Sequence, residues 1–136
     1  FALMALGAEG VQMGTRFALT DESSASDIFK EYCLRLNEGD TKLLLKKLAP
    51  TRLVPNSFRD RVEAAEGRGA SAEELRELLG RGRAKKGIFE GDLEEGELEI
   101  GQVAALFRRR QSVDEVMKEL LEGYRRASDK IRSAGL

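Results

Sequence analysis

The sequence predicts an α/β fold in which one strand near the N-terminus is followed mostly by helices. Residues 10–15 carry the signal for a buried strand, because apolar Val11 and Met13 alternate with Gln12 and Gly14. Further along the chain, apolar residues recur at three- and four-residue steps behind residues that favour helix starts. The length of 136 residues is sufficient for one ordinary domain with a hydrophobic core.

The residues before this strand predict the end of a helix. Phe1 to Leu6 is an apolar run that we expect to form the last turns of a buried helix, capped by Gly7. The run is too short for a signal sequence and lacks a basic leader. Because the first methionine is Met4, we expect the chain to be the C-terminal part of a longer protein.

The first long helical pattern follows a turn at residues 20–24 and ends at Gly39. Its predicted inner face consists of Ile28, Phe29, Tyr32, Cys33 and Leu36. Cys33 is expected to be a buried hydrophobic residue and not a nucleophile, because the chain has no histidine to activate it.

An extended stretch is predicted next. Residues 42–48 are apolar-rich without a clean period. Pro50 and Pro55 bracket residues 51–54, for which we expect a short strand. A helix should follow from a cap at Asn56 or Ser57 to about Glu66, closed by Gly67 and Gly69, with an inner face of Phe58, Val62 and Ala65.

Two capping boxes mark the clearest helix starts. Ser71 with Glu74 begins a helix that stops at the following glycine, Gly80. Another box, at residues 112–115, begins a helix that should continue to about Ser133. The apolar faces are Leu75, Leu78 and Leu79 in the first helix, and Val113, Val116, Met117, Leu120, Leu121 and Tyr124 in the second.

Between these two helices we expect an acidic turn at residues 91–96 and a further helix over residues 98–110. That helix should bury Val103, Leu106 and Phe107. Two charged runs lie nearby. One is basic, comprising Arg81, Arg83, Lys85 and Lys86, and the other is acidic, comprising Glu90, Asp92, Glu94, Glu95, Glu97 and Glu99.

Both charged runs are interpreted as solvated surface. A phosphate or nucleic-acid role is the alternative for the basic run, but no aromatic side chains for base stacking lie nearby. A cation site is the alternative for the acidic run, but its spacing matches no calcium loop. Neither alternative is favoured.

The composition excludes several classes of protein. The formal net charge of −1 gives no electrostatic reason to bind nucleic acid or acidic membranes, and no apolar run approaches the length of a membrane span. A single cysteine excludes an internal disulfide framework and fits a reducing compartment, so we expect a cytoplasmic protein. No histidine is present, so any catalytic histidine must lie outside these residues, and no metal site is expected.

The segment from Gln12 to Thr15 is the strongest candidate for a ligand site. Glycine lets an anion approach the main chain, and amides at a strand end are good phosphate ligands. Plain turn chemistry would also explain a Gly-Thr pair. However, a buried helix, a glycine, a strand and then Gly14-Thr15 form the last helix-to-strand step of a (β/α)8 barrel, where phosphate sites recur.

Four segments of the chain, in order, resemble the nitronate monooxygenase family, formerly called 2-nitropropane dioxygenase, which includes FMN-dependent enoyl-acyl-carrier-protein reductases. They are residues 5–17, similar to the flavin-phosphate segment; residues 40–56, ending in Arg52-Leu-Val-Pro-Asn56; residues 86–92, similar to a lid segment; and residues 99–106, similar to the helix start A-G-Q-x-A-G-L. Four ordered matches are far more specific than any one of them.

The resemblance implies a TIM-barrel flavoprotein whose eighth strand is residues 10–15. Gln12, Met13, Gly14 and Thr15 would hold the phosphate of FMN, mostly through the amides of Gly14 and Thr15, with the Thr15 hydroxyl as a further donor. The family's glycine loop and active-site histidine do not occur in this chain. We therefore expect the chain alone neither to hold FMN tightly nor to turn over.

The resemblance also implies that Gly101 and Gln102 approach the isoalloxazine ring. Glu99 and Ile100 stand where many relatives carry small residues, so access to the flavin would differ. The expected organisation is a helix end and eighth strand with the phosphate turn at residues 1–20, a helical covering subdomain at residues 21–96, and C-terminal helices that pack back on the barrel at residues 97–136.

The expected activity of the parent protein is that of an FMN-dependent oxidoreductase. Its substrate would be an alkyl nitronate with oxygen, or an enoyl thioester or quinone reduced with NAD(P)H. Partners would be this small molecule and NAD(P)H, with a homodimer left open and no nucleic acid or membrane. The rival hypothesis is a non-enzymatic helical interaction module whose Gly-Thr turn is purely structural.

Overall fold

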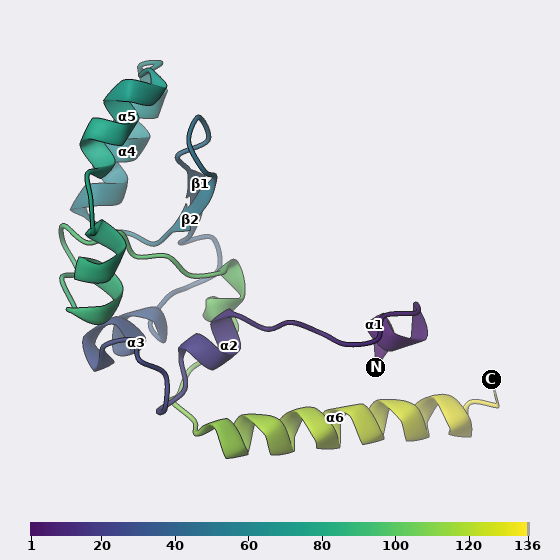
Figure 1. Cartoon of the computed structure of the whole chain (residues 1–136). Helices are drawn as coiled ribbons and strands as arrows, with labels where there is room; N and C mark the ends of the chain where they lie inside the picture. Colours follow the sequence, from purple (N-terminus) through teal and green to yellow (C-terminus); the bar gives the residue numbers. More distant parts are fainter. Residues whose placement is uncertain (136) are drawn as a thin grey trace.

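The computed structural model describes residues 1–135 and combines helices with one small β-hairpin (Figure 1). The α-helices are α1 (Ala2–Ala5), α2 (Thr15–Ala18), α3 (Asp27–Cys33), α4 (Ser57–Gly67), α5 (Ala72–Leu79) and α6 (Val113–Ser133). A π-helix, η1, spans Lys85–Phe89, and a 3-10 helix, η2, spans Gln102–Leu106. Strands β1 (Lys42–Leu44) and β2 (Thr51–Leu53) pair antiparallel.

The three hydrophobic clusters lie within residues 15–112, which we call the body, and α6 adds one buried residue, Val116, near its start. The largest cluster packs α3 against the segments before α4 and around η2, and it comprises Leu19, Ala25, Phe29, Cys33, Leu34, Leu36, Val54, Leu98, Ile100 and Ala104. A second packs the hairpin on α4, through Leu44, Leu45, Leu53, Phe58 and Val62. A third joins α4 to α5, through Ala65, Ala70 and Leu75. The apolar inner face predicted for α4 is therefore confirmed.

The flanks are α1 with the arm that follows it (residues 1–14) and α6. Both extend away from the body, and their far ends lie on the same side of the molecule (Figure 1). They touch through the rings of Phe1 and Tyr124, whose centroids are 5.5 Å apart. No helix within residues 1–135 combines the length and the apolarity needed to cross a membrane.

The predicted strand at residues 10–15 is not a strand in this structure. Residues 10–13 pair with no other described segment, Thr15 begins α2, and Val11 is 49% exposed. The reason is that a strand needs a neighbouring strand for its backbone hydrogen bonds, and no strand within residues 1–135 pairs with this segment. The alternating pattern is present in the sequence, but this segment joins no sheet within the described residues.

The helix end predicted before this segment does form, as α1, but the prediction that it is buried was wrong. The amides of Gly7 and Ala8 donate to the carbonyl oxygens of Met4 and Leu3, at 2.9 and 3.0 Å. With Gly7 at φ +98°, this is a Schellman cap. All four residues of α1 are exposed because no described segment covers them.

Helix α3 is shorter than predicted and begins at a different cap. The Ser26 hydroxyl oxygen accepts the amide of Phe29 at 3.2 Å, and the helix ends at Cys33, well before Gly39. Phe29, Cys33 and Leu36 are buried as predicted, but Ile28 is 55% exposed.

Lys30 lies on the inner side of α3 and is only 1% exposed. Its Nζ donates to the carbonyl oxygens of Asp21 and Ser23, at 3.2 and 2.8 Å. The ammonium therefore satisfies backbone carbonyls of the preceding turn, which compensates part of the cost of burying a charge. Sequence periodicity alone does not identify this arrangement.

Both capping boxes are confirmed, at Ser71 with Glu74 and at Ser112 with Glu115. Asn56 caps α4 by accepting the amide of Arg59 at 2.8 Å. These starts were predictable because a cap depends on residues within one turn of each other.

The predicted helix over residues 98–110 was wrong. The segment before Gly101 is extended and runs beside β2, where the amide of Ile100 donates to the Arg52 carbonyl oxygen at 3.3 Å. Only residues 102–106 are helical, as η2. Val103 and Leu106, expected inside, are 42% and 76% exposed, whereas Phe107 packs partly on the core. Pairing with β2 is a long-range contact that a local helical pattern does not reveal.

The basic run is exposed as expected at Arg81, Lys85 and Lys86, but it is largely helical and not a loop. Most of it forms the end of the α5–η1 connection and η1, and Arg83 is half-buried. The Arg83 guanidinium stacks on the Phe58 ring at 4.5 Å and donates to the carbonyl oxygens of Leu79 and Glu95, at 2.8 and 2.6 Å.

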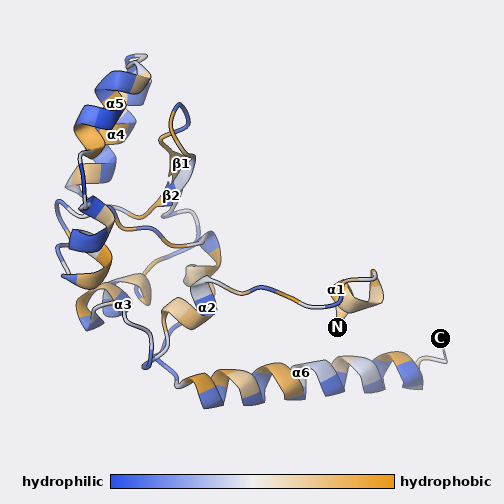
Figure 2. Ribbon diagram, in the orientation of Figure 1, coloured by the Kyte–Doolittle hydropathy of each residue, from blue (hydrophilic) through white to orange (hydrophobic). Residues whose placement is uncertain are grey.

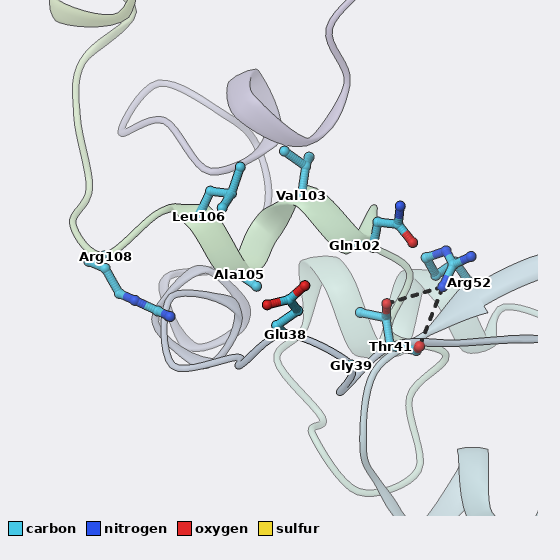
Figure 3. A pocket seen from close by; sticks show the side chains of 9 residues that line it. All are labelled: Glu38, Gly39, Thr41, Arg52, Gln102, Val103, Ala105, Leu106 and Arg108. Carbon is cyan, nitrogen blue, oxygen red and sulfur yellow. Dashed lines mark hydrogen bonds between the residues drawn. The ribbon is translucent and has the colours of Figure 1, made fainter.

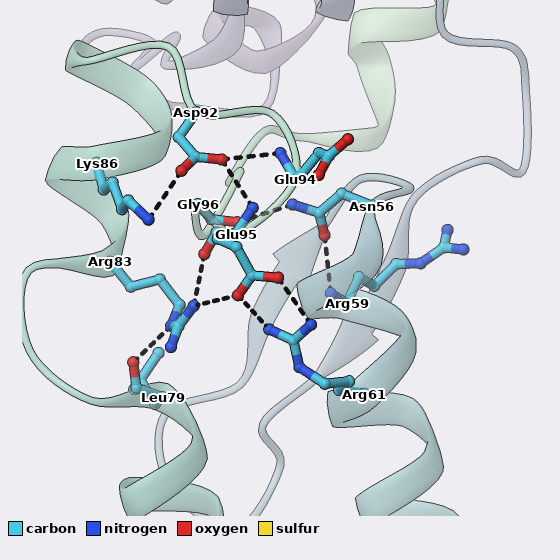
Figure 4. A network of polar contacts seen from close by, with 10 residues as sticks. All are labelled: Asn56, Arg59, Arg61, Leu79, Arg83, Lys86, Asp92, Glu94, Glu95 and Gly96. Atoms are coloured by element: carbon cyan, nitrogen blue, oxygen red, sulfur yellow. Dashed lines mark hydrogen bonds and ion pairs between the residues drawn. The ribbon is translucent and has the colours of Figure 1, made fainter.

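The acidic turn is fixed to α4 and η1 by a polar network (Figure 4). The Glu95 carboxylate accepts from Arg61 and Arg83, and the Asp92 carboxylate accepts Lys86 Nζ at 2.8 Å. Asn56 Nδ2 donates to the Gly96 carbonyl oxygen at 2.8 Å. The acidic run is therefore only partly surface, and its member Glu97 is buried at 8% exposure.

Two glycines let this turn cross η1. A Cβ on Gly96 would lie 2.2 Å from the Cα of Gly87 and 2.4 Å from the Asp92 carbonyl oxygen. Real Cβ atoms do not approach backbone so closely. The close crossing therefore requires glycine on both segments.

Candidate functional site

The predicted phosphate turn lies where the N-terminal arm enters the body. Gly14 is the N-cap of α2, and the first intrahelical bond runs from the Ala18 amide to the Gly14 carbonyl oxygen at 2.9 Å. The amides of Thr15, Arg16 and Phe17 have no hydrogen-bond acceptor among the described residues. Amides of a first helical turn point out of the N-terminal end, so these donors face one side.

A hollow of about 360 Å³ borders this turn. It is lined by Gln12, Met13, Gly14, Thr15, Arg16, Val103, Phe107 and Leu120. The four phosphate residues predicted from the sequence therefore share one hollow. A Cβ added to Gly14 would meet no atom within 4 Å, so the main chain is open to a ligand there.

Thr15 joins the turn to the segment that precedes η2. Its Oγ1 accepts the amide of Gly101 at 3.1 Å, between residues that are 86 positions apart. Thr15 and Gly101 also border a second hollow, of about 420 Å³, together with Arg52 and Glu99. The first and last of the four resembling segments thus meet in space.

Gln102 faces a different and larger hollow, of about 700 Å³ (Figure 3). This third hollow is lined by Glu38, Gly39, Thr41, Arg52, Gln102, Val103, Ala105, Leu106 and Arg108. Gln102 directly follows Gly101, which contacts the turn through Thr15. The side chain of Gln102, however, does not line the hollow of Gln12 to Thr15.

Arginine supplies the cationic groups around these hollows. Arg52 donates weakly to Thr41, at 3.3 Å to the hydroxyl and 3.4 Å to the carbonyl oxygen, and Arg108 donates to the Leu36 carbonyl oxygen at 2.6 Å. Among residues 1–135 neither guanidinium lies within 4.0 Å of a carboxylate oxygen. Arg52 was singled out by its family segment, but no local signal identifies Arg108.

Two carboxyl groups near β2 have altered acidity. Burial raises the pKa of Glu97, and the charge of Glu99 raises it further, against a smaller opposite effect of Arg83. Glu99 is exposed as a whole residue, yet partial desolvation of its carboxyl raises its pKa as well. Both groups therefore hold a proton more readily than free glutamate does.

Arg16, the residue after the turn, connects it to α6. Its guanidinium lies 4.6 Å from the centre of the Phe107 ring and pairs with the Glu119 carboxylate. Sequence analysis did not single out Phe107 or Glu119 for this contact, because the pairing spans distant segments. Within the described residues no cluster of candidate metal ligands is found.

Comparison with known protein families gives one match that covers most of the chain. A family model described as "Nitronate monooxygenase" matches residues 1–123. Among curated proteins, the "Probable nitronate monooxygenase" of Staphylococcus saprophyticus is 55% identical over 60 residues, which are 42% of this chain and 16% of the relative. That of Bacillus subtilis is 48% identical over 42 residues, 31% of this chain and 12% of the relative.

Comparison with solved structures finds FabK from Thermotoga maritima, at a TM-score of 0.85 and 32% identity. The match covers 97% of this chain and 42% of FabK. A mutant of the same protein matches with a TM-score of 0.77 and 30% identity. The chain thus spans less than half of the solved relative, and the matched segments span less than a fifth of the curated ones.

Proposed function

The chain belongs to the nitronate monooxygenase family, as its four ordered segments predict, and from this premise we propose that it supplies part of the flavin-phosphate site of an FMN-dependent oxidoreductase. The observation that carries the proposal is the turn at Gly14 and Thr15. It combines open space at the glycine with amides that have no acceptor among the described residues.

The donor set of this turn suits a phosphate. Thr15, Arg16 and Phe17 offer backbone amides, and backbone N–H groups at a helix start bind anions well. The Thr15 hydroxyl accepts from Gly101, so its own hydrogen stays available for a phosphate oxygen. Gln12 and Met13 would complete the wall of the site, since they line the same hollow.

When bound, FMN supplies hydride and electron transfer, which no side chain of this chain can provide. Gln102 would approach its isoalloxazine ring. The hollow that contains Gln102, Arg52 and Arg108 would leave room for a reaction partner with an anionic group. We propose an alkyl nitronate as the substrate, or an enoyl thioester or quinone reduced with NAD(P)H. The catalytic base would come from residues outside this chain.

We propose further that in the intact protein residues 10–13, which precede the N-cap of α2, pair as the eighth strand of a TIM barrel, and that α6 packs back on that barrel. Support comes from the exposed apolar side chains of both flanks, such as Leu6 at 85% and Leu121 at 52% exposure. A polypeptide that leaves such side chains in water gains free energy by covering them. The larger solved relative has the additional length that a barrel needs.

The test is flavin binding by the intact protein. Purified wild type should be yellow and should retain FMN through gel filtration. Gly14→Glu and Thr15→Asp should abolish retention, because each places a negative charge against the phosphate. Gly67→Glu is the matched control, since it adds the same charge at an exposed helix end away from the site.

A colourless wild type that ignores added FMN would contradict the proposal and favour the helical interaction module. If FMN is retained, flavin reduction by NADH and by NADPH, followed by a screen of nitronates, enoyl thioesters and quinones, identifies the substrate. Circular dichroism of each variant establishes that it is folded.

A further inference from the structure

One hydrogen bond connects the phosphate turn to the segment that carries Gln102. The amide of Gly101 donates to Thr15 Oγ1 at 3.1 Å. The approach is so close that a Cβ on Gly101 would lie 2.5 Å from that oxygen. Glycine at this position therefore lets the two segments touch, and the contact is directed at a single hydroxyl group.

The chemistry of a hydroxyl makes this contact sensitive to a ligand. Threonine has one O–H donor and two acceptor lone pairs. While Oγ1 accepts from Gly101, its hydrogen can be donated to an anion. A hydroxyl that donates to a charged acceptor becomes a better acceptor itself, because chained hydrogen bonds polarise one another.

The rest of η2 is fixed independently of this bond. Ala104 is fully buried in the core, and its amide donates to the Gly101 carbonyl oxygen at 3.0 Å. Beyond η2, the Phe107 ring is covered by the Arg16 guanidinium at 4.6 Å. Among the described residues Thr15 Oγ1 is the acceptor of the Gly101 amide, so this amide at the start of η2 reports directly on Thr15.

We propose that Thr15 is a positioning residue that couples phosphate binding to the placement of Gly101 and Gln102. The inference rests on the proposed FMN site. Phosphate bound at the turn orients the Thr15 hydroxyl, which strengthens the bond to Gly101 and holds the start of η2. Gln102 is then fixed at the edge of its hollow only when the phosphate site is filled.

The experiment measures hydrogen–deuterium exchange at Gly101 in the intact protein, with and without FMN. In wild type, FMN should slow exchange of this amide about tenfold, which corresponds to one strengthened hydrogen bond. Thr15→Ser keeps the hydroxyl and should retain the protection. Thr15→Val keeps the shape but not the hydroxyl, so Gly101 should exchange faster without FMN and gain no protection on binding.

Flavin affinity gives a second readout from the same proteins. Thr15→Val should weaken FMN binding about 10- to 100-fold, the range for loss of a hydrogen bond to a charged group, and Thr15→Ser should restore most of it. Thr20→Val is the matched control. It removes a buried hydroxyl that donates to the Phe17 carbonyl oxygen at 2.8 Å without touching Gly101.

The outcomes are distinguishable. FMN binding that protects Gly101 equally in wild type and Thr15→Val overturns the coupling and leaves the FMN site intact. The same holds if wild type binds FMN without any protection of Gly101. A wild type that binds no FMN overturns the proposed function and the coupling together.

Discussion

The body and the flanks contain the same kinds of apolar residue but differ in what surrounds them. In the body, Leu75 and Phe58 are fully buried. In the flanks, Leu6 and Leu121 are 85% and 52% exposed, although their helices are properly capped. Figure 2 shows hydrophobic residues recurring along α6 with little of the chain beside them. Capping thus marks where these helices begin or end, whereas packing decides which of their apolar side chains are buried.

The largest expected effect is a difference between two leucine truncations, each on a helix. Leu75→Ala should lower the free energy of unfolding of the 136-residue chain by about 2–5 kcal/mol, because it leaves a cavity. Leu121→Ala should change it by less than about 0.5 kcal/mol. Urea denaturation followed by circular dichroism measures both, and equal effects would abolish the distinction between body and flank.

The crossing of η1 and the acidic turn offers the next test. Gly96→Ala should destabilise the body by about 1–3 kcal/mol, because the new Cβ would meet backbone atoms. Gly67→Ala is the control, at a helix end with no atom within 4 Å of the added Cβ. It should be neutral or stabilise by up to about 1 kcal/mol. Thermal unfolding of the two variants compares them directly, and a tolerated Gly96→Ala would refute the close crossing.

The two capping boxes should respond differently. Ser71→Ala should cost about 1 kcal/mol of global stability, because α5 unfolds together with the body. Ser112→Ala removes an equivalent cap from α6. It should lower helical content in circular dichroism while leaving the main unfolding transition in place. A shift of that transition by Ser112→Ala would show that α6 folds with the body.

The smallest effect is a pH dependence that arises in the body. Hydrogen bonds from Lys86 and from the amides of Glu95 and Glu94 lower the pKa of Asp92 to about 2. An unfolded aspartate has a pKa of about 3.9, so the stabilisation by Asp92 is present above that pH and is lost as the pH falls toward 2. Asp92→Asn should therefore lower stability at neutral pH and flatten its decline below pH 4.

The check is a series of urea titrations between neutral and acidic pH. Lys86→Gln removes the first of these hydrogen bonds and should produce part of the same flattening. A wild-type decline that Asp92→Asn leaves unchanged would place the acid sensitivity elsewhere in the chain.

The sequence predicted those features that depend on a few neighbouring residues. Ser71, Ser112 and Asn56 cap helices as expected, and the inner face of α4 is correct. The errors arose from partners that are distant in the chain. Residues 98–100 are extended because they pair with β2. Residues 10–13 stay unpaired because no strand among the described residues pairs with them.

The candidate site follows the same division. Gln12 to Thr15 were predicted as phosphate ligands; in the structure they border one hollow, and their role toward FMN stays a prediction. The bond between Thr15 and Gly101 could not be derived from the sequence, because nothing local relates two positions 86 residues apart. The π-helical form of η1 was likewise hidden in a basic run, since π-helices are rare and have no simple signal.

The buried ammonium of Lys30 has a practical consequence. Among the lysines of residues 1–135 it is the one that solvent does not reach, and every other lysine is exposed. Reagents that acylate amines therefore react with the other lysines of the folded molecule. They react with Lys30 only when the turn at residues 21–25 has released its Nζ. Acylation of Lys30 would thus report whether the body is intact, without any probe being introduced into the chain.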